Sequence, residues 1–226
     1  MDTARNPVDR PAPARWRRPV PLLLSLLGAI AMNATALQDR TIGFDDAEPG
    51  VLPAEWSAGI TGRGVSQWVV ARDETAPSPP NVLEQDEAGT FPWCVLRAVS
   101  QADGYVEVKM KPVSGREDQA GGVVWRFKDG NRYYVARANA MEDNVSLYYT
   151  EGGARKTLKY VDAPVKRGAW HTLRVEYKGA HIRVILDGVA RIEMDDTHIA
   201  GPGAVGLWTK ADSITRFDDF RYGGAP

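Results

Sequence analysis

Residues 118–149, DQAGGVVWRFKDGNRYYVARANAMEDNVSLYY, contain the pattern that decides the fold. Three segments in and just after this stretch alternate between apolar and polar residues, and they span Gly122–Phe127, Arg132–Asn139 and Asn144–Thr150. Short connections that contain Asp, Gly and Asn separate them. Alternating runs rich in Val, Tyr and Trp, joined by such turns, are typical of antiparallel hairpins. The stretch therefore predicts a three-stranded antiparallel meander.

The alternation also predicts which side chains share a face, because successive side chains of a strand point to opposite sides of a sheet. The set expected to face the core consists of Trp125, Phe127, Tyr134, Ala136, Val145, Leu147 and Tyr149. The set expected on the opposite face consists of Arg126, Tyr133, Arg137, Asn139, Asn144, Ser146 and Tyr148. Flat rings and planar hydrogen-bond donors on one surface suit a sugar ligand. An exposed antiparallel face that is polar by default is the simpler alternative.

The rest of the chain shows more short alternating segments and no run of ten or more residues with helical periodicity. These segments are Ile42–Asp46, Gln67–Arg72, Val82–Gln85, Trp93–Ala98, Gly104–Lys111, Trp170–Tyr177, His181–Leu186, Val189–Met194, Ala204–Thr209 and Ile214–Tyr222. Asp187-Gly188 is a dipeptide favoured in type I′ hairpin turns. Many short strands with regularly spaced turns predict an all-β protein, a two-sheet antiparallel β-sandwich of jelly-roll type.

The first 36 residues have the features of a signal peptide. Basic residues at Arg15, Arg17 and Arg18 precede an apolar run over 22–32, and Ala34-Thr35-Ala36 has the small-x-small pattern of a cleavage site. The apolar run is too short to span a bilayer as a stable helix. We therefore expect a signal peptide over 1–36, one β-sandwich domain over 37–226, and a secreted or periplasmic protein. A retained signal anchor is the alternative.

Charge and cysteine content exclude several classes of partner and chemistry. Of the 28 basic and 29 acidic side chains, five Arg and two Asp lie in the first 36 residues, so the remaining domain is mildly acidic. Nothing in this balance attracts nucleic acid, or a membrane once the signal peptide is removed. The single cysteine, Cys94, cannot form an internal disulfide and lies in an apolar segment, which is typical of inert packing.

Several motifs together resemble the concanavalin A-like lectin/glucanase superfamily. They are Gly43–Asp46, Gly121–Phe127, Asn131–Arg137, Trp170–Val175, Leu186–Gly188, Val205–Thr209 and Phe217–Phe220. Within that superfamily, the chain looks most like secreted bacterial domains grouped with the 3-keto-disaccharide hydrolases, loosely described as family-16-like. The resemblance covers nearly all of the chain after Ala36. It implies a concanavalin A-like jelly roll, a fold that hosts lectins, carbohydrate-binding modules, glucanases, lyases and adhesion modules.

The motifs of catalysis and metal binding are sparse. The E-x-D-x-x-E pattern that the glucanase resemblance would require is absent from the sequence, which leaves Asp118 and Glu142 as the acid/base candidates. Many sandwiches of the resembled kind hold a structural calcium ion where the first and last strands meet, so the resemblance implies Asp218 with Asp45 or Asp46 as ligands. These carboxylates would otherwise cap turns or pair with nearby arginines.

Three functions fit these observations. The first is glycan binding on the concave sheet, with a site that consists of Gln119, Arg126, Tyr133, Arg137, Asn139, Asn144, Tyr148 and Trp208. The second is a glycoside hydrolase or lyase of the 3-keto-disaccharide hydrolase type that acts in the same groove. The third is a structural or adhesion module with a protein partner.

Overall fold

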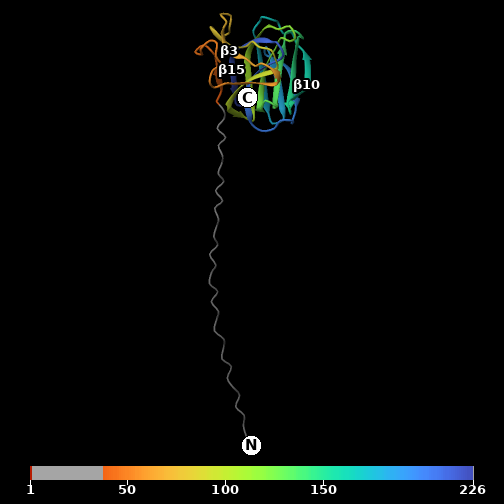
Figure 1. Cartoon of the computed structure of the whole chain (residues 1–226). Coiled ribbons are helices and arrows are strands. Elements are labelled where there is room, and N and C mark those ends of the chain that lie inside the picture. The colour runs from red at the N-terminus through yellow and green to blue at the C-terminus, as the bar shows by residue number, and fades with distance from the viewer. Residues whose placement is uncertain (2–37, 226) are drawn as a thin grey trace. The chain divides into compact units, whose positions relative to one another are not determined.

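The computed structural model describes residues 38–225 together with Met1, and residues 38–225 form a two-layer β-sandwich (Figure 1). The expected all-β fold with two antiparallel sheets is confirmed. The predicted signal peptide lies outside the described residues. Within 38–225, no helix is long and apolar enough to cross a membrane.

One layer is an eight-stranded sheet and the other a seven-stranded sheet. The eight-stranded sheet has the order β13 (Val189–Asp195), β12 (His181–Leu186), β11 (His171–Lys178), β6 (Gly104–Ser114), β15 (Ile214–Gly223), β4 (Asn81–Gln85) and β3 (Trp68–Arg72), with β1 (Arg40–Ile42) paired to β15. The seven-stranded sheet has the order β10 (Ala154–Asp162), β9 (Asn144–Glu151), β8 (Arg132–Asn139), β7 (Ala120–Asp129), β14 (Gly203–Thr209), β5 (Gly89–Gln101) and β2 (Ser57–Gly64).

The predicted meander is present as β7, β8 and β9. Antiparallel pairing joins Trp125 to Tyr134 and Tyr134 to Tyr149, so side chains in this row share one face. The predicted turn between β12 and β13 also has the expected backbone, with φ of 51° at Asp187 and 79° at Gly188. Positive φ at both central residues defines the type I′ turn.

The main core lies between the two sheets. The ring of Trp125 from the seven-stranded sheet stacks on Tyr134 and on Tyr177 of the opposite sheet, with ring centroids 5.2 Å and 5.8 Å apart. Cys94 on β5 belongs to the same core and has no exposed surface. Burial of this apolar area, at roughly 25 cal/mol per Å², is the main stabilising contribution for a chain without disulfides.

Two strands of the seven-stranded sheet, β2 and β10, were not expected. Their burial alternates poorly, because both are edge strands with one side open to solvent. In β2, a Cβ atom at Gly59 would lie 2.3 Å from the Trp93 ring, so only glycine lets the strand pass under that indole. A glycine that is required for close contact with a neighbouring ring interrupts the alternation of apolar and polar residues by which a strand is recognised.

Candidate functional site

The outer face of the seven-stranded sheet, which is turned away from the core between the sheets, carries most of the residues expected to bind sugar. Tyr133 and Tyr148 lie there in a second hydrophobic cluster, whereas Tyr134, Leu147 and Tyr149 belong to the main core. The predicted phase of β8 and β9 is therefore correct. Asn139, Asn144 and Ser146 follow the same alternation.

The centre of this outer face is closed by its own side chains. The second cluster consists of Trp93, Val95, Val124, Phe127, Tyr133, Val135, Tyr148, Ala204 and Trp208, with Phe91 packed against it. Trp208 and Tyr133 are fully buried, and Phe91 stacks on Trp208 with ring centroids 5.5 Å apart. Tyr133 and Trp208 were expected to present aromatic surface to a ligand, but other side chains of the outer face cover both rings.

Arg126 does not lie with Arg137, and this part of the sequence prediction was wrong. A bulge interrupts the β7–β8 pairing after Trp125, and Arg126 takes a positive φ of 46°. The bulge reverses the phase of β7, so Phe127 joins the outer cluster and not the core. The Arg126 guanidinium lies 5.5 Å from the Tyr177 ring centroid, on the core side.

The contacts of Arg126 identify it as a clamp that holds loops together. Its guanidinium donates to the backbone oxygens of Ala102 at 3.0 Å, Ile199 at 3.1 Å and Gly179 at 2.6 Å. It also forms a 3.3 Å ion pair with Asp103. Most of its donors are thus used by the protein itself, so Arg126 no longer belongs to the candidate sugar site.

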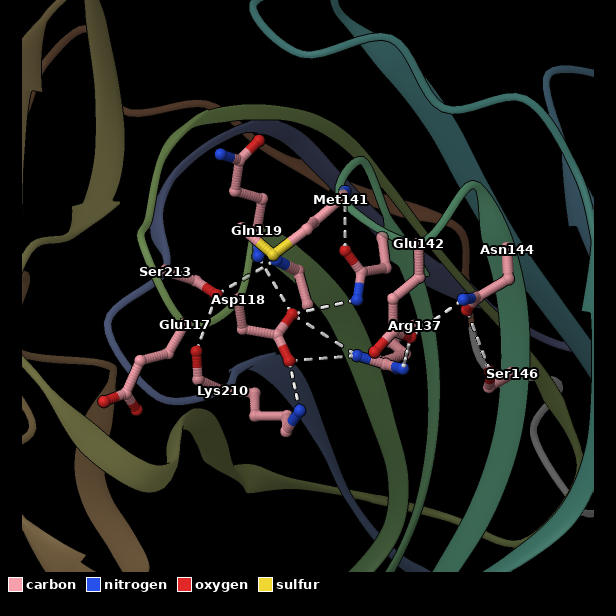
Figure 2. Close-up of polar contacts among 12 residues, drawn as sticks. Glu117, Asp118, Gln119, Arg137, Met141, Glu142, Asn144, Ser146, Lys210 and Ser213 are labelled. Carbon is pink, nitrogen blue, oxygen red and sulfur yellow. Dashed lines mark hydrogen bonds and ion pairs between the residues drawn. The ribbon is translucent and has the colours of Figure 1, made fainter.

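Asp118 is the centre of a buried charge network at one end of the outer face (Figure 2). Its carboxylate lies 3.4 Å from Nη1 of Arg137, accepts a 2.9 Å hydrogen bond from Nδ2 of Asn139, and pairs with Lys210. The side chains of Asp118 and Arg137 are 1% and 3% exposed. These charges, which lie far apart in the sequence, are therefore compensated inside the protein.

Arg137 also contacts Glu142, which is partly exposed (Figure 2). Its Nη2 lies 2.5 Å from Oε2 of Glu142, and its Nε donates to the Tyr148 hydroxyl at 3.2 Å. Asn144 donates to Glu142 at 2.8 Å and to the Tyr160 hydroxyl at 2.6 Å. Burial favours the neutral form of Glu142, but the Asn144 hydrogen bond and the Arg137 charge outweigh it and hold the pKa of Glu142 below its usual value.

We call Asp118, Arg137, Glu142, Asn144 and Lys210 the charged rim. Glu142 and Lys210 connect this network to solvent, with side chains that are 38% and 27% exposed. Lys210 also lines an open groove of about 510 Å³, whose walls include Arg63, Thr90, Phe91, Glu117 and Asp212. The rim therefore offers one accessible anion and one accessible cation beside an aromatic ring.

The loop that carries Asp118 is held by Asp212. Its carboxylate accepts hydrogen bonds from the backbone N–H groups of Arg116 at 2.7 Å, Glu117 at 2.9 Å and Asp118 at 3.1 Å. Gln119, which was expected to flank the site, points away from Arg137 in Figure 2 and donates to the Gly115 oxygen at 2.9 Å. Gln119 thus braces this loop and is not part of the rim.

Sequence reasoning missed Lys210, Phe91 and Arg155. Lys210 was detectable, since it has the parity of Trp208 and directly follows that strand. Phe91 and Arg155 come from β5 and from the unexpected strand β10, and they meet across the outer face, with the guanidinium 4.6 Å from the ring centroid. Other strands separate β10 from β5 in the sheet, so no local sequence pattern reports that these two side chains meet.

The two acid/base candidates lie close together but differ in access. Asp118 is enclosed by Arg137, Asn139 and Lys210, so its oxygens are already occupied. Glu142 is partly exposed and is ionised at neutral pH. An ionised carboxylate can accept hydrogen bonds from hydroxyls or remove a proton, whereas it cannot serve as a general acid.

The metal candidates Asp45 and Asp218 lie near each other, as expected for the meeting of the first and last strands. Both bind Ser78: its N–H donates to Asp218 at 2.8 Å and its hydroxyl to Asp45 at 3.1 Å. Burial, together with the neighbouring charges of Asp219 and Asp45, raises the pKa of Asp218 to about 6. Among residues 38–225, no group of three or more His, Cys, Asp or Glu side chains is arranged to hold a metal.

Comparison with known proteins gives one family match and several structural matches. A family described as the 3-keto-alpha-glucoside-1,2-lyase-like domain matches residues 55–222. No curated protein matches the sequence.

Solved structures share the fold at low identity. A carbohydrate-binding module, CBM66 from Bacillus subtilis, is 20% identical, with a TM-score of 0.62 over 74% of this chain and 94% of that chain. A Bacteroides ovatus GH16 protein, solved in complex with a G4G4G3G product, is 11% identical, with a TM-score of 0.53 over 76% of this chain and 95% of that chain. A Bacillus licheniformis beta-glucanase is 13% identical, with a TM-score of 0.50 over 78% and 95%. These solved structures share the two-sheet jelly-roll fold with this chain.

Proposed function

Because the chain belongs to the 3-keto-alpha-glucoside-1,2-lyase-like domain family, we propose that it binds a glycan or small sugar at the charged rim. The position of the rim on the outer face of the seven-stranded sheet supports this proposal, since that face has fixed donors and acceptors next to aromatic side chains. The sugar-binding names of structurally similar proteins agree with it.

One observation carries the proposal: a buried charge network ends in two accessible groups of opposite sign, Glu142 and Lys210. Burying ion pairs costs desolvation free energy, and apolar residues of similar volume are often at least as stabilising. The network holds Glu142 in place through Arg137 and Asn144. A fixed acceptor loses little conformational entropy on binding, which is how preorganisation raises affinity.

The test is a glycan array with residues 37–226, followed by titration of the bound glycans. Glu142→Gln and Lys210→Met should each weaken binding roughly tenfold, the effect of losing one charge-assisted hydrogen bond. Glu193→Gln on β13, where Glu193 is 60% exposed, is a matched control that should leave affinity unchanged. Unchanged affinity in both rim variants would contradict the assignment of the site to the charged rim. If no glycan on the array is bound, the proposed sugar binding is contradicted as well.

A second candidate function is cleavage of a sugar substrate at the same rim. Glu142 favours it, because an ionised and partly exposed carboxylate beside Lys210 can act as a base. The family description names 3-keto-alpha-glucosides and a 1,2-lyase. Incubation with a 3-keto-glucoside should then release a product, and Glu142→Gln should abolish that release. Binding without product would leave sugar recognition alone.

We also propose export and a structural calcium ion. The predicted cleavage near Leu37 is tested by mass spectrometry of the exported protein, and an intact Met1 would contradict it. Calcium is proposed at Asp45 and Asp218, whose oxygens suit this ion. Burial, with a smaller contribution from the charges of Asp219 and Asp45, raises the pKa of Asp218, and a bound cation would stabilise its ionised form.

A further inference from the structure

Arg155 occupies the outer face next to the charged rim. It comes from the edge strand β10, and its guanidinium carbon lies 4.2 Å from the Tyr148 ring centroid, 4.6 Å from that of Phe91 and 5.6 Å from that of Trp208. Cation–π attraction within about 6 Å holds such a group over aromatic rings. The three rings thus fix the guanidinium, but they use none of its N–H donors.

The charge of Arg155 is not neutralised by the protein. No ion pair of Arg155 is present among the described residues, and its Nη1 is buried without a hydrogen-bond partner. Arg137 on the same face is different, because it pairs with both Asp118 and Glu142. Burial, together with repulsion from Arg137, lowers the pKa of the Arg155 guanidinium.

Two further unpaired polar atoms lie near Arg155. Thr150 faces Arg155 directly across the β9–β10 pair, and its hydroxyl is buried without a partner. The indole Nε1 of Trp208, whose ring lies under the guanidinium, also has no partner. Buried donors without acceptors cost about 1–3 kcal/mol each. Thr150 and Trp208 are fully buried, so these two atoms lie out of reach of a ligand. Arg155 itself is only partly buried, so a ligand that brings acceptor oxygens and negative charge would compensate its guanidinium.

We propose that the glycan recognised at this site is acidic and that its carboxylate or sulfate group pairs with Arg155. A planar guanidinium matches the two oxygens of a carboxylate or sulfate in a bidentate pair, and both sources of charge share this chemistry. The hydroxyls of a neutral sugar would accept hydrogen bonds but leave the cation uncompensated. This inference rests on the proposed sugar binding and names the class of ligand.

The experiment compares acidic glycans with their neutral counterparts on the full domain. Oligogalacturonate and its methyl ester test the carboxylate, and a sulfated galactan and its desulfated form test the sulfate. At least one acidic form should bind roughly 10- to 100-fold more tightly than its neutral partner, as expected for a charged hydrogen bond. A preference for the neutral forms, or equal affinity, would overturn the inference while leaving sugar binding intact.

Variants of β10 assign the effect to one side chain. Arg155→Met keeps most of the apolar stem and should remove the preference for the acidic form. Lys156→Met is the matched control, because Lys156 is exposed and pairs with Tyr149 on the opposite side of the strand. A preference that persists in Arg155→Met would contradict the inference. If Arg155→Met does not fold, the comparison of the acid with its methyl ester on the unmodified protein still tests whether the ligand is acidic. No binding to any glycan would overturn the proposed function as well.

Discussion

Asp118 and Asp218 are both buried carboxylates, but their surroundings are opposite. Asp118, at 1% exposure, lies against Arg137 and Lys210. Asp218, at 0% exposure, accepts N–H groups from Ser78 and Asp219, and the described residues give it no ion pair. A buried charge is costly unless it is compensated. The charge of Asp118 is therefore compensated by side chains of the protein, whereas the charge of Asp218 has to be compensated by a proton or a bound cation.

The largest effect should come from removing the compensating charge of Asp118. Arg137→Met leaves a buried carboxylate with Lys210 as its remaining cation, so we expect a loss of about 3–5 kcal/mol in the free energy of unfolding. Urea denaturation measures this loss as a lower transition midpoint.

Arg183→Met on β12 is the control for that variant. The Arg183 side chain is 43% exposed and pairs with Glu176 at 3.5 Å, so its loss should cost only about 0–1 kcal/mol. Equal effects of the two substitutions would show that burial does not distinguish the two networks.

The pH dependence of stability should expose the uncompensated Asp218. Its folded pKa of about 6 lies above the ordinary value of 3.8, so the folded state binds this proton more tightly than the unfolded state. The stabilising contribution is complete below pH 3.8 and is lost as pH rises through 6. Without metal, the loss from this group between pH 3.8 and 7 is up to roughly 3 kcal/mol.

The measurement is the difference in unfolding free energy between the unmodified protein and Asp218→Asn, both in chelator, from pH 4.5 to 7. The difference isolates Asp218, because all other titrating groups are common to the two proteins. A difference that stays constant over this range would mean that Asp218 does not titrate there.

Calcium should stabilise the protein by a slightly smaller amount. A ligand that binds only the folded state adds about 2.7 kcal/mol at a concentration one hundred times its dissociation constant. The gain in melting temperature should be larger at pH 7 than at pH 5, because protonated Asp218 is a poor ligand. Identical melting curves in millimolar calcium and in chelator would remove the metal, and Asp218→Asn should lose the response.

The smallest effect is expected for Glu142→Gln. The amide keeps an acceptor for Asn144, and Arg137 retains Asp118, so the loss in unfolding free energy should be about 1 kcal/mol or less. Thermal unfolding at pH 7 checks this. A loss as large as that of Arg137→Met would indicate that Glu142, and not Asp118, is the main counter-charge of the rim.

Much of the fold could be predicted from local sequence, and the reason is periodicity. The phase of β8 and β9 follows directly from the alternation around Tyr134 and Leu147. The error at Arg126 has a specific cause, since one bulge residue with positive φ reverses every following side chain. Nothing in the letters WRF marks that position.

The candidate site could be predicted only in part. Arg137, Glu142 and Asn144 come from one hairpin, so their proximity follows from the turn between β8 and β9. Asp118 and Lys210 are 92 residues apart, and they meet because β7 pairs with β14. Such long-range pairing depends on sheet order, which a single sequence with many similar strands does not specify.

The labelling rate of Cys94 can report how often the two sheets of the sandwich separate. The thiolate is the reactive form, and burial both raises the pKa of this thiol well above its usual value and shields the sulfur from reagents. Chemical labelling therefore has to wait for the two sheets to separate. Because Cys94 is the only cysteine in the chain, every labelled molecule records one opening event at one known place.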